Sequence, residues 1–585
     1  MLKSYPTYYL RTYMKVNVGE LIVDSLRKYS VDHSFGIVAS SIAEILDLLP
    51  LAGIKYYGAR HEQWAGHMAD SYTRISGKTS LVLAQSGAGV TNLVTAAATA
   101  LRAFSPIIII SGGAQSEEKG KGTYQELDHV RIMSPVTKFS SSIPNPSRAQ
   151  EIIRKAIVIA RTPPKGPVYI EVPRDLFYEI VDYDAERVED VQATFSPKEE
   201  IITKFIELVN NSIKPIVLAG GGVIWSGASK LLEEFSSTFK VPVVSTYSHN
   251  DVMDNSNYLW LGSIGRAGSK AAMKVYSMSD LIIALGTRMD SFTFLPYYGF
   301  KYDNSNAKVI QVDIDPQIIM NKSKGLEMGV VSDIKEFLGG VMKYVKEKGV
   351  KINEREQWIR DCIKLREEWR RELESQGITG KIGGNGLYPT IEEVYRELRK
   401  HLSKEAIVTL DVGASPSLAY TYLEFTSSPS LLTPNPVGGL GFSIPAAIGA
   451  KIASPKRDVL AILGDGAFTM ELPSLITSIE YNTNIKVLVM DNSAWGSEKN
   501  YQKIYYDSRY VGSDIKNPDL AKIAEDIGFK ASVVESKGQM SSYIEEMLKS
   551  RESHVLIVKV DPNWFPPPAR IDVVKKPKRG LFNLT

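Results

Sequence analysis

Short apolar stretches alternate along most of the chain with longer stretches whose apolar residues follow helical spacing. Each short stretch has the length and residue types of a buried strand. They read "SLVLAQ", "PIIIISGG", "PVYIEV", "PIVLAGGG", "VPVVSTY", "DLIIALG" and "KVIQVDID". Strands that alternate with helices in this way predict an α/β fold with parallel sheets.

The alternation breaks twice, and the breaks suggest how the chain divides. Residues 181–198 are charged and lack periodicity, and residues 346–386 read as a charged helix followed by a glycine-rich loop. A chain of 585 residues also exceeds what one hydrophobic core usually serves. We therefore expect three doubly wound parallel-sheet domains and a C-terminal tail, at 15–180, 199–345, 387–560 and 561–585.

Composition narrows the class of protein. The net charge of +3 is small and the charges are interspersed, so we expect no nucleic-acid partner. The single cysteine, Cys362, excludes an intrachain disulfide framework and a cysteine-rich metal site, which fits a cytoplasmic protein. The apolar run at 107–110 is too short to span a bilayer, and residues 1–13 do not read as a secretory signal, so we expect no membrane partner.

One stretch, "GDGAFTMELPSLITSIEYNTNIKVLVMDN", places an acid and an amide after consecutive strands. Strands are expected at 458–463 and 485–490, with a helix over 472–481 between them. Carboxyl ends of parallel strands lie on one sheet edge, so Asp465 and Asn492 can share one ion. Oxygen ligands beside glycines suit a hard cation such as Mg²⁺ that bridges to a diphosphate. The alternative is that both residues only cap helices.

A second stretch, "GARHEQWAGHMADSYTRISGK" at 58–78, places Glu62 near the start of a predicted helix. That helix has one apolar face, formed by Ala65, Met68, Ala69 and Tyr72. A glutamate in a first turn also complements the helix dipole, so Glu62 alone does not indicate catalysis.

Together these motifs resemble those of thiamine diphosphate enzymes of the acetolactate synthase family, and the resemblance spans nearly the whole chain. In that family an asparagine follows Gly-Asp-Gly at the spacing seen here, 27 positions from Asp465 to Asn492. Further similar segments are "SGAGVTN" at 86–92, "GTYQELDHV" at 122–130, "DVGASPS" at 411–417 and "GGLGFSIPAAIGA" at 438–450.

The resemblance implies two cofactors, thiamine diphosphate and Mg²⁺, and a role for each matching residue. Asp465 and Asn492 would bind the metal through their side chains and Ala494 through its backbone carbonyl. Glu62 would activate the cofactor, with Gln125 near the reactive ring. The remaining cofactor contacts would be Gly413, Ala414, Ser415, Gly438, Leu440, Gly464, Gly466, Ala467, Trp495 and Gly496.

Physical chemistry supports two of these roles. The cofactor's aminopyrimidine can remove the thiazolium proton only as its rarer imino tautomer. A carboxyl group hydrogen-bonded to the pyrimidine ring nitrogen favours that tautomer, and Glu62 would supply this hydrogen bond. Leu440 would hold the two rings in a V shape. In this family the domains that carry Glu62 and Asp465 meet across a subunit interface, which implies a homodimer or homotetramer.

Several segments are similar to those of the sulfoacetaldehyde acetyltransferases, a branch of this family. They are "TYSHNDVMD", "GTRMDSFTFLPYYGFKY", "NSAWGSEKNYQKIYYDSRYVG" and "KKPKRG". The likeness implies that sulfoacetaldehyde and phosphate give acetyl phosphate and sulfite, with an acetyl group carried on the cofactor. Trp495, Glu498 and Lys499 would face the substrate, with Lys499 as a cation for a sulfonate or phosphate. The alternative for Lys499 is a solvated helix start.

Two other activities stay open from sequence. In an acetolactate synthase, pyruvate would be decarboxylated and the resulting hydroxyethyl group would add to a second 2-oxo acid. A catalytically inactive regulatory paralogue is a third reading, but it should have lost Glu62, Asp465 or Asn492, and all three are present. Residues 290–292, Asp-Ser-Phe, depart from the Asp-Asp-Arg of flavin-carrying members, so we do not predict FAD.

Overall fold

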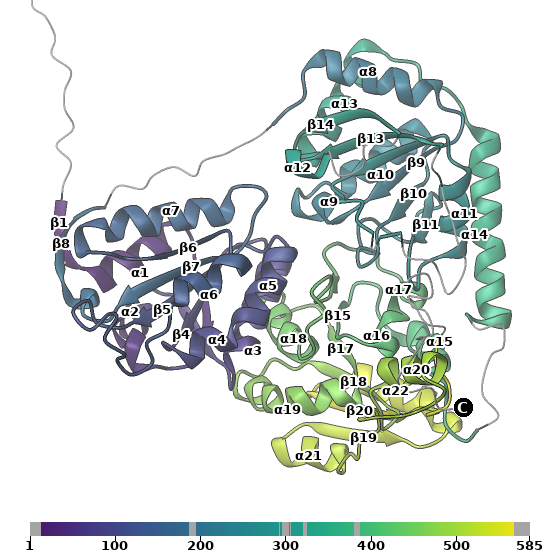
Figure 1. Ribbon diagram of the computed structural model, residues 1–585. Helices are drawn as coiled ribbons and strands as arrows, with labels where there is room; N and C mark the ends of the chain where they lie inside the picture. The colour runs from purple at the N-terminus through teal and green to yellow at the C-terminus, as the bar shows by residue number, and fades with distance from the viewer. Residues whose placement is uncertain are drawn as a thin grey trace, which may run out of the picture. The chain divides into compact units, whose positions relative to one another are not determined.

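The computed structural model describes residues 13–185, 195–291, 293–294, 304, 306–319, 325–378 and 386–566. The chain forms two compact units, Met1–Ala193 and Thr194–Thr585. Within the described residues there are three six-stranded parallel sheets and one two-stranded antiparallel ribbon (Figure 1). The predicted fold class, three doubly wound parallel sheets flanked by helices, is confirmed.

The first unit contains one six-stranded sheet, in the order β3-β2-β4-β5-β7-β6. Its strands, with the ribbon strands β1 and β8, are β1 (Tyr13–Asn17), β2 (His33–Gly36), β3 (Lys55–Gly58), β4 (Ser80–Ala84), β5 (Ile107–Gly113), β6 (Phe139–Ser142), β7 (Val168–Pro173) and β8 (Ile180–Asp184). Its helices are α1 (Val18–Lys28), α2 (Ala43–Leu51), α3 (Glu62–Ser76), α4 (Ala88–Asn92), α5 (Val94–Arg102), α6 (His129–Met133) and α7 (Ala149–Arg161). Every residue of β5 is buried, as expected of a parallel strand covered on both faces.

The central sheet of the second unit has the order β11-β10-β9-β12-β13-β14. Its strands are β9 (Pro215–Ala219), β10 (Val243–Ser245), β11 (Trp260–Ser263), β12 (Leu281–Leu285), β13 (Lys308–Asp313) and β14 (Leu326–Val331). Its helices are α8 (Glu199–Asn211), α9 (Gly221–Trp225), α10 (Ser229–Phe239), α11 (Lys270–Met278), α12 (Pro316–Ile319), α13 (Ile334–Lys348) and α14 (Glu356–Gln376).

The last sheet has the order β16-β15-β17-β18-β20-β19. Its strands are β15 (Ile407–Leu410), β16 (Leu431–Leu432), β17 (Val459–Gly464), β18 (Lys486–Asp491), β19 (Lys530–Val534) and β20 (His554–Lys559). Its helices are α15 (Ile391–His401), α16 (Ala414–Ser417), α17 (Ala419–Tyr422), α18 (Ser443–Ala453), α19 (Asp465–Glu480), α20 (Gly496–Tyr505), α21 (Leu520–Ile527) and α22 (Met540–Lys549).

Three local features differ from the sequence expectations. Residues 181–184, expected within a linker, pair as β8 with β1. Helix α14 is not a free connector, because its apolar face, including Trp358 and Cys362, is buried in a core shared with the central and last sheets. Helix α19 begins at Asp465, seven residues before the expected start, and it contains Pro473. Parts of the segments discussed above lie outside the described residues; they are 1–12, 186–194, 292, 295–303, 379–385 and 567–585.

Cys362 has no reactive character in this fold. Its side chain is buried among core residues, and burial raises the pKa of the thiol far above its ordinary value. The thiol therefore stays protonated at neutral pH.

A polar seam joins the central and last sheets; we call residues 246–255 and the facing residues 420–431 the seam. Asn255 exchanges backbone and side-chain hydrogen bonds with Phe425, at 2.8 and 2.9 Å. Asp251 accepts the backbone N–H groups of Ser430 and Leu431 at 2.7 and 3.0 Å. Burial raises the pKa of Asp251 to about 6, although these hydrogen bonds oppose the shift. The seam thus fixes the start of the last sheet by hydrogen bonds to a buried carboxyl group.

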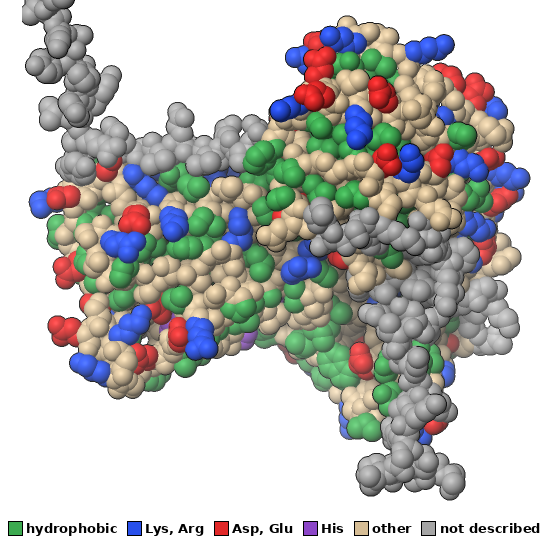
Figure 2. Space-filling view, turned by 45° about the horizontal axis from the view of Figure 1, so that its top comes forward, with side chains coloured by type: hydrophobic (Ala, Val, Ile, Leu, Met, Phe, Trp, Pro, Cys, Tyr) green, Lys and Arg blue, Asp and Glu red, His purple; other side chains and the backbone are tan. Residues whose placement is uncertain are grey.

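The exposed surface carries charges of both signs. On the face shown in Figure 2, Lys and Arg side chains lie among Asp and Glu side chains, without a large area of one sign. Among the described residues, every helix falls short of the length and apolar character needed to cross a membrane.

Candidate functional site

Glu62 is the first residue of α3, and its carboxylate is held in place by two neighbours. The side chain is buried, and Asn92 donates its amide hydrogen to Glu62 Oε2 at 2.9 Å. Gly89 lies against the other oxygen: a Cβ placed on Gly89 would be 3.2 Å from Glu62 Oε1. The segment "SGAGVTN" therefore contributes an amide that orients Glu62 and a glycine that lets the backbone approach it.

Gln125 lies on a strained turn that packs against the same segment. Its φ of 65° is positive, which is uncommon for a residue other than glycine. Gly87 also has a positive φ, 68°, and a Cβ on it would lie 3.0 Å from Gln125 Cβ. Gln85 donates to Gln125 Oε1 at 2.8 Å. The loops at 86–92 and 122–130 thus hold each other in shape, which is what brings Gln125 to the region of Glu62.

A buried pair that the sequence did not indicate supports this turn. The N–H of Gly87 donates to His129 Nε2 at 2.8 Å, so Nδ1 carries the proton and donates to Glu171 Oε2 at 2.7 Å. Burial raises the pKa of Glu171, but hydrogen bonds from His129 and Ser142 and the charge of Lys119 lower it below its usual range. His129 falls within the quoted "GTYQELDHV", yet no pattern marked it.

In the second unit, Asp465 and Asn492 follow neighbouring strands, as expected. Gly464, at the end of β17, is in register with Met490 of β18, so the two strands end at the same edge. Asp465 and Asn492 are both buried. Asn492 Oδ1 accepts the N–H of Ala494 at 3.2 Å, which shapes the turn after β18. Among the described residues, no group of three or more His, Cys, Asp and Glu side chains is arranged as a metal site.

The surroundings of Asp465 favour a positive charge. Burial raises the pKa of Asp465, and the nearby Asp491 raises it further. Lys559 pairs with Asp491 and, against the effect of burial, keeps the pKa of that carboxyl low. Asn517 donates one amide group to both carboxylates, at 2.7 Å from Asp465 and 3.1 Å from Asp491. Two carboxylates with one lysine leave negative charge at the edge that a divalent cation would balance.

Several glycines leave open space where phosphate oxygens can approach the backbone. A Cβ on Gly438, whose φ is 74°, would meet nothing within 4 Å, and one on Gly413 would meet only Pro416 at 3.6 Å. A Cβ on Gly464 would have its nearest neighbour at 4.0 Å. These openings, with the donor set of Asp465 and Asn492, fit a diphosphate and a hard cation.

Gly466 serves a different purpose. A Cβ there would lie 2.5 Å from the indole ring of Trp495, so the ring packs directly on the first turn of α19. Trp495 precedes α20 and donates its N–H to Ser513 at 2.8 Å. Ala467 is buried in the same turn. This contact joins the segment after β18 to the start of α19.

Buried carboxyl groups tie the other cofactor loops together. Asp411 Oδ2 accepts the N–H groups of Phe442 and Ser443 at 2.7 and 3.0 Å, which connects the segment 411–417 to the loop that carries Gly438 and Leu440. Glu471 of α19 accepts the N–H of Ile444 at 2.5 Å. Burial, and then the proximity of Asp411, raise the pKa of Glu471 well above its ordinary value. Ala414 and Ser415 are buried in α16. The start of α18 is thereby fixed to both loops.

Lys499 is not a free cation. Its ammonium pairs with Asp514 at 2.5 Å and lies 5.3 Å from the centre of the Tyr510 ring. Its side chain is only 20% exposed, whereas that of Asp514 is 66% exposed. Glu498, in the same first turn of α20 as Gly496, is exposed. An anionic substrate would have to share Lys499 with Asp514.

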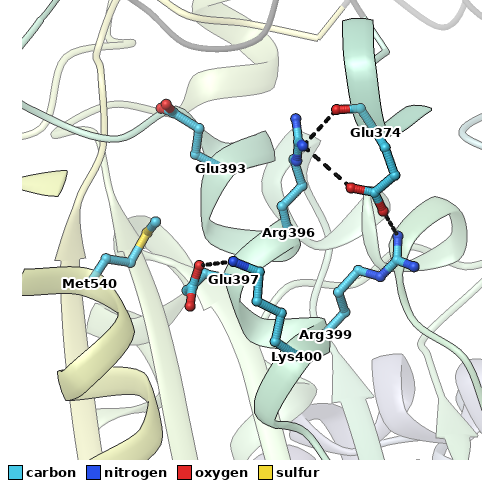
Figure 3. Close-up of a pocket in the computed structure, with 7 residues that line it drawn as sticks. All are labelled: Glu374, Glu393, Arg396, Glu397, Arg399, Lys400 and Met540. Carbon is cyan, nitrogen blue, oxygen red and sulfur yellow. Dashed lines mark hydrogen bonds and ion pairs between the residues drawn. The ribbon is translucent and has the colours of Figure 1, made fainter. Parts of the chain in front are cut away.

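A cavity of about 440 Å³ lies elsewhere in the second unit (Figure 3). Its charged groups neutralise one another: Glu374 pairs with Arg396 and Arg399, and Lys400 with Glu397. It contains none of the candidate residues. Its lining consists of Glu374, Glu393, Arg396, Glu397, Arg399, Lys400 and Met540.

Comparison with known proteins identifies the same three regions. Family models match at residues 16–132 (thiamine pyrophosphate enzyme, N-terminal TPP binding domain), 202–341 (central domain) and 411–558 (C-terminal TPP binding domain). The sulfoacetaldehyde acetyltransferase of Roseovarius nubinhibens is 31% identical over 579 residues, which is 96% of this chain and 95% of that protein. That of Castellaniella defragrans is 30% identical over 584 residues, 96% of each. A probable acetolactate synthase large subunit of Methanocaldococcus jannaschii is 31% identical over 574 residues, 96% of this chain and 95% of that protein.

Proposed function

The chain belongs to the thiamine pyrophosphate enzyme family, and from this premise we propose that it converts sulfoacetaldehyde and phosphate into sulfite and acetyl phosphate. The observation that carries the choice of substrate is the first turn of α20. There Lys499, whose ammonium pairs with the more exposed Asp514, lies directly after the candidate metal residues, where a sulfonate or a phosphate would share this cation with Asp514.

Thiamine diphosphate would be held with Mg²⁺ at the edge of the last sheet. Asp465, Asn492 and the carbonyl of Ala494 would bind the metal, and the open backbone at Gly413 and Gly438 would receive the diphosphate. When bound, the cofactor supplies a carbon nucleophile that accepts the electron pair of the cleaved bond. Leu440, on the loop tied to Asp411, would support its rings. The other assigned contacts, Ala414, Ser415, Gly464, Gly466, Ala467, Trp495 and Gly496, are proposed with them.

Glu62 would hold a proton against the cofactor's pyrimidine ring. Asn92 occupies one of its oxygens, which leaves Oε1 as the atom available to a ring nitrogen. Gln125, held by Gln85 and by its contact with Gly87, would face the reacting groups. The hydrogen bonds that position Glu62 and Gln125 come from other residues of the protein. The placement of these two side chains would therefore not depend on the substrate.

An acetolactate synthase is the second candidate. Its support is the 31% identity to the Methanocaldococcus jannaschii protein, which equals the identity to the Roseovarius nubinhibens acetyltransferase. Identity therefore does not separate the two activities, and the reaction products must.

We propose a homodimer or homotetramer in the cytoplasm, with active sites completed between subunits. The loops around Glu62 support this, because Val38, Tyr124 and Leu127 leave apolar side chains 73%, 80% and 48% exposed. We also keep the domain limits 15–180, 199–345 and 387–560, with the tail at 561–585, as a proposal.

The test uses purified full-length protein with thiamine diphosphate, Mg²⁺ and phosphate. Sulfoacetaldehyde should give sulfite and acetyl phosphate in equal amounts, and EDTA should abolish both. Release of carbon dioxide and acetolactate from pyruvate, with sulfoacetaldehyde inert, would refute the acetyltransferase and leave the synthase. Equal cofactor binding with and without EDTA would refute the metal assignment.

A further inference from the structure

Residues 511–517, which we call the strap, run across the turn that follows β18. The N–H of Trp495 donates to Ser513 O at 2.8 Å, and the N–H of Ile515 donates to Ser493 O at 2.9 Å. Gln502 of α20 is bonded to Val511 in both directions, at 2.9 and 3.0 Å. The strap is thus attached both to the turn that carries Asn492 and Ala494 and to the helix behind it.

The strap ends at Asn517, whose side chain reaches the two carboxylates at the edge of the sheet. Its Nδ2 donates to Asp465 Oδ2 at 2.7 Å and to Asp491 Oδ1 at 3.1 Å. Its Oδ1 is buried and has no hydrogen-bond partner in the part of the chain that the structure describes. A buried acceptor without a partner is costly, so the amide is held in this orientation by what its N–H groups contact.

The two carboxylates differ in what else holds them. Asp491 is fixed by Lys559 and by the N–H of Ser493 at 2.9 Å. Among the described residues, Asn517 is the one side chain shown to donate a hydrogen bond to Asp465. The carboxyl of Asp465 is also hydrogen-bonded to Asp491, so Asn517 is the neutral side chain that orients it from the strap.

We propose that Asn517 is a positioning residue for the divalent cation, which it serves by orienting Asp465 without binding the metal itself. The inference rests on the proposed function, because it assigns Asp465 to the metal. Residues that orient metal ligands typically change metal affinity by roughly 10- to 100-fold when they are lost. No pattern in the sequence around "KNPD" indicates this role.

The experiment measures Mg²⁺ binding by calorimetry in saturating thiamine diphosphate, together with the melting temperature of the metal-free protein. Asn517→Ala should raise the dissociation constant of Mg²⁺ by roughly 10- to 100-fold. Gln502→Ala is the matched control, because it loosens the strap without touching Asp465, and it should raise that constant much less. Metal-free Asn517→Ala should melt close to the metal-free wild type.

The outcomes separate this inference from the proposed function. Wild-type protein that binds no Mg²⁺ overturns both. If the wild type binds Mg²⁺ normally, two results overturn the role of Asn517 alone. One is an unchanged dissociation constant in Asn517→Ala, and the other is an equal loss of affinity in Asn517→Ala and Gln502→Ala. If Asn517→Ala does not fold, Asn517→Leu serves: a side chain of similar size without an N–H for Asp465 should shrink the rise in melting temperature that Mg²⁺ produces. An unchanged rise overturns the inference.

Discussion

Replacing Asp251 by asparagine tests the seam between the central and last sheets. Asp251 is 1% exposed, its Oδ2 accepts two backbone N–H groups of the last sheet, and its Oδ1 has no hydrogen-bond partner among the described residues. Burial raises its pKa from 3.8 to about 6, with the N–H groups of Ser430 and Leu431 and the charge of Arg457 acting in the opposite direction. Asparagine keeps an oxygen for the two N–H groups and removes the ionisable proton.

The direction in which Asp251 changes stability with pH follows from how many protons the folded and unfolded chains bind. Between the unfolded value of 3.8 and about 6, the folded protein keeps a proton that the unfolded chain has lost. The stabilisation from Asp251 is therefore complete below pH 3.8 and is lost as the pH rises through about 6. The difference between the two pKa values corresponds to about 3 kcal/mol of unfolding free energy.

The assay is urea unfolding of metal-free wild type and Asp251→Asn, followed by tryptophan fluorescence at pH 4 to 8. Because other titrating groups are common to both proteins, their effects cancel in the difference. From pH 4 to pH 7.5, the variant should gain about 2 kcal/mol relative to wild type, since part of the difference already lies below pH 4. Asp254→Asn, the same change of charge three residues further on at a less buried position, is the control and should show no such trend. A pH-independent difference for Asp251→Asn would refute the reasoning.

Four further variants test the candidate site. Glu62→Gln should bind cofactor but lose roughly 10²- to 10⁴-fold in kcat, measured together with hydrogen exchange at the cofactor's thiazolium carbon; unchanged exchange would contradict its role. Lys499→Ala should mainly raise KM for sulfoacetaldehyde, by roughly tenfold, whereas Asp514→Asn should lower it by freeing the lysine; the same KM in all three proteins would remove Lys499 from the substrate site. His129→Phe should lower kcat by up to roughly 100-fold with little change in KM, since it releases the Gly87 turn against Gln125, and a changed KM with unchanged kcat would contradict that reasoning.

The sequence determined the fold because the strands and helices can be recognised from the pattern of apolar residues within each short segment. The apolar runs that form β5 and β17 are long enough, and apolar enough, to be recognised as strands without knowing their neighbours. The spacing between Asp465 and Asn492 spans one strand-helix-strand unit, and the right-handed crossover rule then places both at one edge. The start of α19 was missed because glycine and aspartate at 464–466 read as a turn, whereas Asp465 opens the helix.

Tertiary structure alone decided which side chains support those residues. Asn517 lies 52 positions from Asp465, and Glu171 lies 42 positions from His129, so no local pattern could join either pair. The same holds for Lys499, whose charge suggested a free cation until folding brought Asp514 against it. A hydrogen bond or an ion pair requires two atoms from separate elements to lie about 3 Å apart, within a few tenths of an ångström. Only the packing of the sheets and helices sets that distance.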